Sequence, residues 1–567
     1  MTTLRTTAGS VGSDGRCSYL FTRAEHRWRS AILLVAALVA CRSSTPLSDA
    51  EYDAAPSVAT EATLSRRLDQ LAADSMLGRG PGQRGDTMTV AYLEAQMRAI
   101  GLAPVDDYGY RQPVALRRLH ADGQGTFRVN GRAVPLDARS GVIFAATKLG
   151  THAVRNAPVV FVGYGLVAPE HGWDDYGEID LRGKVALILD GEPAALSQRR
   201  FGTRGDRSPH AFAFLKGRHA LAHGAVGVVM IRTGTDSIHR ARRRRLQDDV
   251  LVGEAEDATP EPAVTLHLSK SAGEALANAV GTTLAVWHAA AEGPTFDPQD
   301  LPLRLDATVR ATGVRFMSHN VVGVVVGSDP VLRDECVVYL AHWDGYGIGL
   351  AVAGDSIYNG ALDDAAGVSS MLLVAEAVRA LPRAPRRTMV FVATTAEEFG
   401  LRGANAYAAD PVCRLERTAL AVGMDWTWTW GMTDTIVSNG FGYSTVDSLA
   451  GRVATRLGKA FAPGVGEYWL ASDHAALVLR GVPAWFGGLD GDVRGRPAGW
   501  ASAQLATQAT HVPSDERKES WNLAGALLEV RFVFELGARA AESELGPTWT
   551  AQSEFRRAAA ARRSNGW

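Results

Sequence analysis

The chain has 567 residues, of which 46% are hydrophobic and 21% charged. A chain of this length has material for two or three globular units with large buried cores. Its 59 basic and 61 acidic residues nearly cancel. This balance leaves no net field to attract nucleic acid, so we expect no nucleic-acid partner.

The first forty residues predict an export signal. Residues 31–40 form an uninterrupted apolar stretch that follows several basic residues and is too short to span a bilayer. The stretch ends in Leu38-Val39-Ala40-Cys41, which resembles a bacterial lipobox; a plain cleavable signal with an incidental cysteine is the alternative. We therefore expect a signal peptide at 1–40, a lipid on Cys41 that ties the protein to a membrane, and a place in the bacterial cell envelope, periplasm-facing or on the outer surface.

The segment after Cys41 is small and polar, so residues 41–60 are predicted to be a flexible linker. The fold should begin near Leu64. Apolar residues recur at helical spacing from Val90 to Ile100, and Gly101 follows where a left-handed helix cap is wanted. We assign residues 61–150 to the N-terminal part of the main domain.

Residues 151–300 differ from the preceding residues in their pattern of apolar residues, with short β-rich runs at 159–162, 185–189 and 226–231. The runs predict a second, mainly β domain inserted into the chain. With Trp173-Asp174-Asp175-Tyr176 and Leu181-Arg182-Gly183-Lys184 between them, they resemble the protease-associated (PA) domain found inserted in several peptidase families. The resemblance implies a lid or substrate-gating role, without catalytic residues.

Residues 301–543 predict an α/β domain. Near-continuous apolar runs at 321–326, 337–340, 389–392, 420–422 and 482–486 alternate with segments such as 368–381, whose apolar residues have helical spacing. This pattern indicates a mostly parallel central sheet flanked by helices. The tail, 544–567, is rich in Ala and Arg and should be poorly ordered or a short surface helix.

Polar residues directly after apolar strands are the candidates for a site, because ligands bind at the carboxyl ends of the strands in such sheets. His342, Glu398 and Asp425 follow predicted strands, and Asp363 precedes a predicted helix. Singly, each has an ordinary structural explanation, such as a helix cap for the aspartate. Together, one imidazole and three carboxylates at one edge of a sheet suit a hydrolytic zinc site, and His511, in a late loop, can supply a second imidazole.

These segments are similar to peptidase family M28. The chain has His342-Trp343-Asp344, a Gly360–Gly367 turn that contains Asp363, an Ala396–Gly403 turn that contains Glu397 and Glu398, then Asp425, and finally His511-Val512-Pro513, in the order of that family. The resemblance implies two Zn²⁺ ions bridged by Asp363, one completed by His342 and Asp425 and the other by Glu398 and His511. It also implies that Glu397 is the general acid/base and that Asp344 holds the ring of His342.

The chain departs from the family pattern at three positions. Asp364 and Ala366 replace the usual Asn and Ser, so the turn after Asp363 has an extra carboxyl group that would raise neighbouring pKa values unless it is neutralised. Trp426 replaces the usual Met after Asp425, and Trp426, Trp428 and Trp430 either wall a substrate pocket or simply pack. Ser472-Asp473-His474 also resembles a family segment, where His474 is expected to be structural.

The leading functional hypothesis is a zinc-dependent aminopeptidase acting on peptides or proteins. A carboxypeptidase or an amidase on the same fold stays open, as does a binding protein that has lost catalysis, although every ligand position of the family is filled. A serine hydrolase is disfavoured, because no Gly-x-Ser-x-Gly elbow accompanies a suitable Asp and His. Cys336 and Cys413 could form one disulfide or none.

Overall fold

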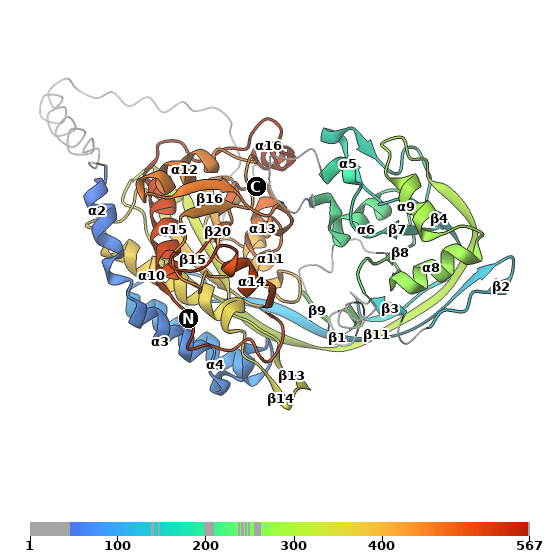
Figure 1. Ribbon diagram of the computed structural model, residues 1–567, viewed down its shortest axis with the longest axis horizontal. Helices are drawn as coiled ribbons and strands as arrows, with labels where there is room; N and C mark the ends of the chain where they lie inside the picture. The colour runs from blue at the N-terminus through green and yellow to red at the C-terminus, as the bar shows by residue number, and fades with distance from the viewer. Residues whose placement is uncertain are drawn as a thin grey trace, which may run out of the picture. The chain divides into compact units, whose positions relative to one another are not determined.

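The computed structural model describes residues 46–137, 141–145, 148–197, 209–235, 239, 243, 246–247, 250–253, 262–507 and 509–564 (Figure 1). The predicted signal peptide and Cys41 lie outside these residues. Within the described ranges, no helix has both the length and the apolar character needed to cross a membrane.

Residues 49–58 of the predicted linker are helical, which corrects the expectation of a flexible tether over this part of 41–60. Helix α2 (Asp49–Ala54) begins with a capping box in which the Ser48 and Glu51 side chains each accept a backbone N–H, and a 3₁₀ turn, η1 (Ala55–Val58), follows. Tyr52 is buried, and its ring lies 6.4 Å from that of Phe534. The Ser-x-x-Glu spacing is a helix-start signal that the polar composition of the segment concealed.

The main sheet has a parallel centre, as predicted. Strands β19 (Ala484–Trp485), β16 (Thr418–Gly423), β12 (Cys336–His342) and β15 (Thr388–Thr394) run parallel in this order. Strand β11 (Gln299–Val325) lies next to β15 and antiparallel to it, and β1 (Arg111–Val129) pairs with β11. The four parallel strands end at the same edge, where the predicted ligands follow them.

Helices cover both faces of this sheet. The even-numbered residues Val338 and Leu340 of β12 pack in one core with helices α11 (Arg402–Ala409) and α13 (His474–Val478). Tyr339 points the other way, and its hydroxyl donates a hydrogen bond to the carbonyl of Val533 in α15 (Ala524–Glu542). Successive side chains of a strand face opposite sides, so apolar residues in a row require a helix layer on each face. On the α15 side also lies α10 (Ala366–Ala380), against α3 (Glu61–Leu71) and α4 (Arg84–Ile100), and α4 ends at Gly101 in the predicted left-handed cap.

The inserted segment folds as a sheet with helices on it. Strands β4 (Gly150–Phe161), β7 (Val185–Leu189), β8 (Gly227–Ile231) and β10 (Val264–Leu268) are parallel neighbours, and β3 (Val142–Ala145) lies antiparallel at the edge. Helices α8 (Lys270–Ala279) and α9 (Leu284–Ala291) pack on one face, and α6 (Ala213–Ala222) packs on the other. The three β-rich runs predicted from the sequence are the strands β4, β7 and β8.

The insert and the main domain share two long strands, β1 and β11. They pair without interruption from Arg111 opposite Val321 to Val129 opposite Leu303. The insert therefore has no clean linker at 150 or 300, and β3 already belongs to its sheet.

The remaining elements are short or peripheral. A disulfide joins Cys336, at the start of β12, to Cys413, with 6.1 Å between their Cα atoms. The tail forms α16 (Arg556–Ser564), which is held by the buried Phe555 and by the indole of Trp549, a donor to the carbonyl of Gly481. The other elements are η2 (Asp74–Arg79), β2 (Arg132–Ala133), β5 (Val167–Ala168), η3 (Pro169–His171), β6 (Trp173–Asp174), α5 (Ala194–Ser197), η4 (Pro209–Ala211), β9 (Val250–Gly253), η7 (Leu332–Asp334), β13 (Gly347–Val352), β14 (Asp355–Tyr358), η8 (Ala361–Ala365), η9 (Leu415–Arg417), β17 (Thr435–Ser438), α12 (Val446–Arg456), β18 (Ala460–Pro463), η10 (Gly466–Tyr468), β20 (Gly487–Asp490) and α14 (Trp500–Thr507).

Candidate active site

The five predicted metal ligands come from five separate segments. His342 is the last residue of β12, Glu398 follows β15, and Asp425 follows β16. Asp363 lies in the η8 turn before α10, next to a cis peptide bond to Asp364. His511 lies in the loop between α14 and α15 with a left-handed backbone, at φ 62°. The parallel strands thus deliver three of the five to one edge.

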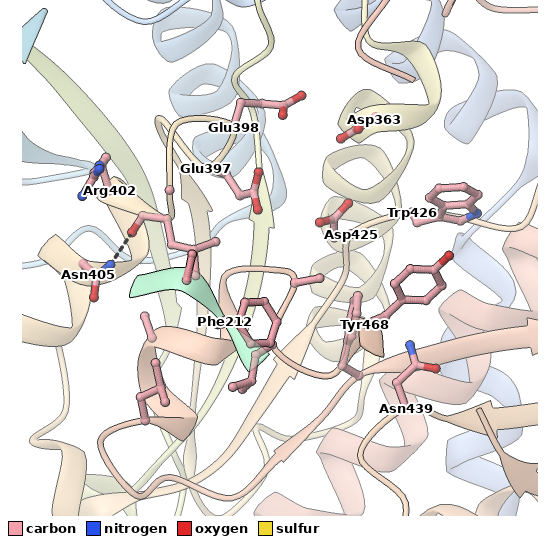
Figure 2. Close-up of a pocket in the computed structure, with 18 of the residues that line it drawn as sticks. Phe212, Asp363, Glu397, Glu398, Arg402, Asn405, Asp425, Trp426, Asn439 and Tyr468 are labelled. Atoms are coloured by element: carbon pink, nitrogen blue, oxygen red, sulfur yellow. Dashed lines mark hydrogen bonds between the residues drawn. The ribbon is translucent and has the colours of Figure 1, made fainter. Parts of the chain in front are cut away.

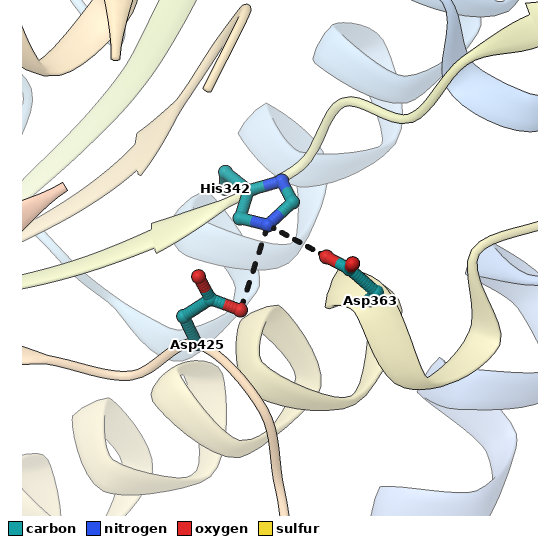
Figure 3. A group of neighbouring side chains, drawn as sticks. All are labelled: His342, Asp363 and Asp425. Carbon is teal, nitrogen blue, oxygen red and sulfur yellow. Dashed lines mark ion pairs between the residues drawn. The ribbon is translucent and has the colours of Figure 1, made fainter. Parts of the chain in front are cut away.

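The five side chains form two groups that share Asp363. His342 Nε2 lies 3.1 Å from Asp363 Oδ1 and 3.7 Å from Asp425 Oδ1 (Figure 3). On the other side of Asp363, His511 Nε2 lies 2.9 Å from Asp363 Oδ2 and 3.2 Å from Glu398 Oε2. Each group therefore offers one imidazole nitrogen and two carboxylate oxygens, and Asp363 offers one oxygen to each.

The charge of this cluster fits bound cations. Burial lowers the pKa of the His342 ring, but the negative charges of Glu397 and Asp425 outweigh burial and raise that pKa well above its usual value. The buried Nε2 atom of His342 has no hydrogen-bond partner among the described residues. A buried polar atom without a partner, facing carboxylate oxygens, is what a metal ligand presents, and the donor set suits zinc.

Glu397 faces the same space, with Oε2 lying 3.9 Å from His342 Nε2. Burial dominates the environment of this carboxyl group and raises its pKa well above the usual value, although the charge of His342 opposes the shift. The sequence left open which of these effects would prevail.

Asp344 has a second partner besides His342. Its Oδ1 atom accepts the Glu397 backbone N–H at 3.0 Å, whereas the His342 ring nitrogen Nδ1 contacts the Asp344 backbone carbonyl at 3.2 Å. The carboxylate itself is 3.7 Å from Nδ1. Asp344 therefore contacts the His342 ring through its main-chain carbonyl and its carboxylate, and the carboxylate also holds the turn that carries Glu397.

Two further carboxyl groups from the sequence analysis are fully buried. Asp364 Oδ1 accepts the backbone N–H of Gly367 at 2.8 Å, and burial, followed by the charge of Asp425, raises the Asp364 pKa well above its usual value. Asp473 Oδ2 accepts the Thr394 hydroxyl, and burial raises the Asp473 pKa to about 7. His474 Nε2 contacts the Trp469 carbonyl at 2.6 Å, in keeping with a structural role.

Arg79, a fully buried cation beside the ligands, carried no signal in the sequence. Its guanidinium donates to the carbonyls of Trp343 (2.7 Å), Leu71 (2.7 Å), Asn359 (2.6 Å) and Gly360 (2.8 Å). Arg79 thereby ties the turn after His342 to the turn before Asp363. Nearby Asp344, Asp363, Asp364 and Asp515 favour its charge and oppose the burial that lowers its pKa.

Asp515 connects two other ligand segments. Its carboxylate accepts the backbone N–H groups of Leu362 (3.1 Å) and Asp363 (3.2 Å), and its backbone carbonyl accepts that of Ala361 (2.9 Å). Because Asp515 lies shortly after His511, it fixes the His511 loop against the Asp363 turn. The motif from Thr510 to Asp515 was visible in the sequence, but the partners of Asp515 were not.

Four of the five predicted ligands, all except His342, border a large cavity of about 1750 Å³. Figure 2 shows Glu397 and Glu398 on one side of Asp425 and the aromatic side chains of Trp426 and Tyr468 on the other. Phe212, which comes from the insert, also lines the cavity. The Trp428 and Trp430 rings meet edge to face at 4.9 Å, so the tryptophans that follow Asp425 both wall the cavity and pack.

The match to known families covers the segment that carries this site. Residues 320–532 match the model of Peptidase family M28. These residues form a metallopeptidase domain of family M28. The M28 domain contains all five predicted ligands and Glu397.

The solved structures that are similar to this chain include three bacterial proteins. An aminopeptidase from Aneurinibacillus sp. strain AM-1 is 19% identical, with a TM-score of 0.44 over 87% of this chain and 95% of its own. The zinc aminopeptidase BSAP from Bacillus subtilis is 18% identical, with a TM-score of 0.43 over 84% and 94%. A peptidase M28 precursor from Shewanella amazonensis SB2B is 19% identical, with a TM-score of 0.41 over 87% and 98%. The family assignment rests on the match over residues 320–532.

Proposed function

We propose that this M28 metallopeptidase is a zinc-dependent aminopeptidase that removes N-terminal residues from peptides. The observation that carries the proposal is the pair of ligand groups joined by Asp363, with the Glu397 carboxyl group facing them from the cavity wall. His342, Asp425 and Asp363 would hold one zinc, and Asp363, Glu398 and His511 the other. One imidazole nitrogen and two carboxylate oxygens at each position form a donor set that zinc accepts in hydrolytic enzymes.

The residues of this chain divide the chemistry between them. Bound zinc supplies Lewis acidity, which makes water acidic enough to attack at neutral pH and stabilises developing negative charge. Glu397 accepts the proton of the attacking water and delivers it to the leaving amine. Asp344 holds the backbone N–H of Glu397, so the base keeps a fixed place relative to His342.

The first test of this function is Glu397→Gln in the chain from residue 42, loaded with zinc. Loss of the general base should lower kcat on aminoacyl-nitroanilides by about a hundred- to ten-thousandfold. Because Glu397 is not one of the predicted ligands, the variant should keep the wild-type content of about two zinc ions per chain, the number expected for a dinuclear site. Elemental analysis and steady-state kinetics on the same samples provide both readouts.

Glu416→Gln is the matched control. Glu416 is an ordinary carboxylate outside the cavity, with its nearest cation, Arg414, at 3.6 Å, so this variant should retain full activity. Hydrolysis by Glu397→Gln at the wild-type rate would refute the assignment of the base. Zinc binding without hydrolysis of any aminoacyl substrate by the wild type would redirect the proposal to a carboxypeptidase or an amidase, and a folded protein with neither metal nor activity would indicate a binding protein.

A further inference from the structure

Two glutamates of helix α15 differ in their burial and in their partners. Glu535 is fully buried and forms ion pairs with Arg456 and Arg539, the latter at 2.6 Å. Glu529 accepts only two backbone N–H groups, with Oε2 bonded to Trp428 N and Oε1 to Leu489 N, both at 2.8 Å. In the described part of the chain, no lysine, arginine or histidine forms an ion pair with Glu529. Glu529 is half-buried and lacks the cationic partner that Glu535 has. A carboxylate that is partly removed from water is stabilised by a cation, so this group can accept one from a ligand.

Glu529 lines the same cavity as the metal ligands. The wall beside it is formed by Gly488, where a Cβ atom would come within 2.6 Å of Glu529 Oε1. A side chain at this position would crowd the carboxylate, so glycine keeps its oxygen atoms accessible. Trp428, whose N–H Glu529 accepts, follows the ligand Asp425 by three residues, a separation of at most roughly 10 Å along an extended chain. The distance from the metal site to the Glu529 carboxylate is therefore short enough for the side chain of one bound substrate residue to span it.

Aromatic side chains form part of the cavity wall beside Asp425. Trp426 is 40% exposed and Tyr468 is 50% exposed, and Figure 2 shows both on the side of Asp425 that is remote from Glu397. Trp428 is almost fully buried, and its indole N–H has no hydrogen-bond partner in the described residues. Aromatic faces attract ammonium and guanidinium groups, and a carboxylate that lines the same cavity without a cationic partner attracts them further.

We propose that Glu529 determines substrate specificity: the aromatic wall and the Glu529 carboxylate form a subsite for a cationic side chain, that of an N-terminal lysine or arginine. The inference rests on the proposed aminopeptidase function, because the M28 site must hold the scissile bond while the side chain enters this subsite. The cationic side chain of the substrate forms an ion pair with Glu529, as Arg456 and Arg539 do with Glu535.

The test compares substrates that differ in one charge. We would measure kcat/KM of the zinc-loaded enzyme for the nitroanilides of lysine, arginine, norleucine and leucine. A charge-assisted contact predicts a preference for lysine over norleucine of about tenfold to a hundredfold. In Glu529→Gln this ratio should fall to about one, a change of the same size. Because both rates come from one sample, the ratio does not depend on the fraction of protein that is folded.

Glu542→Gln is the control on the same helix. Glu542 is paired with Arg383 at 2.8 Å and does not line the cavity, so the variant should keep the lysine preference. A wild-type ratio of one or below, or the same preference in Glu529→Gln, would overturn the inference while the aminopeptidase function stands.

A binding measurement covers the remaining outcomes. The glutamine side chain in Glu529→Gln has one carbonyl oxygen and can accept only one of the two backbone N–H groups, so this variant could fail to fold; the wild type is therefore also tested alone. Calorimetry of free lysine and free norleucine with the zinc-loaded wild type should show lysine binding at least about tenfold more tightly. Equal binding overturns the inference, and no hydrolysis of any of the four substrates is a failure of the proposed function itself.

Discussion

At the scale of single residues, the interior of the M28 domain is notable for carboxyl groups whose protonation depends on burial. Glu529 is one of these groups, and its hydrogen-bond partners include none of the predicted ligands. Burial raises its pKa to about 7, although the hydrogen bonds from Trp428 and Leu489 oppose the shift. The group therefore changes charge in the range where peptidases are ordinarily assayed.

This titration predicts a pH-dependent specificity. Below its folded-state pKa, Glu529 is neutral and gives a cationic side chain no counter-ion; above it, the carboxylate is charged. The lysine-to-norleucine ratio of kcat/KM should rise several-fold between about pH 6 and pH 8. Because the ratio compares two substrates at each pH, effects of pH on the catalytic step itself cancel.

The profile of Glu529→Gln provides the control for other groups. Asp490 of β20 and Asp425 also border the cavity, and both are retained in the variant. If Glu529 is the group that titrates, the ratio in the variant stays flat with pH. A variant that keeps the wild-type rise would show that another group than Glu529 causes the pH dependence.

At the scale of elements, the metal site depends on turns that are joined by hydrogen bonds with Arg79 and Asp515. The η2 turn carries Arg79 with a left-handed backbone at φ 53°, and its guanidinium joins the turns on either side of β13 and β14. Asp515 joins the His511 loop to the Asp363 turn. Neither residue lies among the predicted metal ligands, yet each fixes the backbone of two segments that supply them.

Replacing Arg79 with Met should weaken metal binding. Four backbone carbonyls lose the hydrogen bond from Arg79, and buried carboxylates lose a nearby positive charge, so the ligand turns can move apart. We expect zinc affinity to fall about ten- to a hundredfold, as for other residues that orient ligands. Competition with a chromogenic chelator measures the affinity, and calorimetry measures the Tm of the apo and zinc-loaded forms.

Arg387→Met separates metal binding from stability. Arg387 is also almost fully buried and donates to the carbonyls of Ala540, Ser543 and Glu544, but its ion pair is with Glu335, away from the ligands. Both variants should lower the Tm of the apo protein, because each leaves buried carbonyls unsatisfied. Only Arg79→Met should lower zinc affinity. If both variants lowered zinc affinity equally, Arg79 would have only a general role in stability.

At the scale of the whole molecule, β1 and β11 connect the insert directly to the M28 domain. The insert also contributes to the cavity: Phe212, the N-cap residue of α6, packs against the apolar core that contains α11 and α13. The relation of the insert to the protease-associated domain, with the gating role that this implies, stays a prediction.

Phe212→Ala should change the preference for substrate length. Removing the ring widens the cavity near the metal ligands, so kcat/KM for longer peptides should rise several-fold relative to that for a single aminoacyl-nitroanilide. Val286→Ala, on the exposed surface of α9 in the same insert, should leave this ratio unchanged. An unchanged ratio in Phe212→Ala would show that the insert does not limit substrate length.

The sequence by itself determined the chain order of the predicted ligands, the parallel sheet and the helices that cover it. These features depend on local patterns, since side-chain periodicity is set by backbone geometry and a residue directly after a parallel strand must lie at the carboxyl edge. The same logic found His342, Glu398 and Asp425 before any contact was known, although their roles as ligands stay predictions.

Only the tertiary structure decided which distant groups meet. Arg79 contacts carbonyls more than 250 residues away along the chain, and nothing in the spacing of residues encodes such a contact. The missing cation beside Glu529, the bridge between Cys336 and Cys413, and the extent of the insert likewise follow from packing. Burial and partner choice are properties of the folded interior, and the local pattern of a sequence constrains them only weakly.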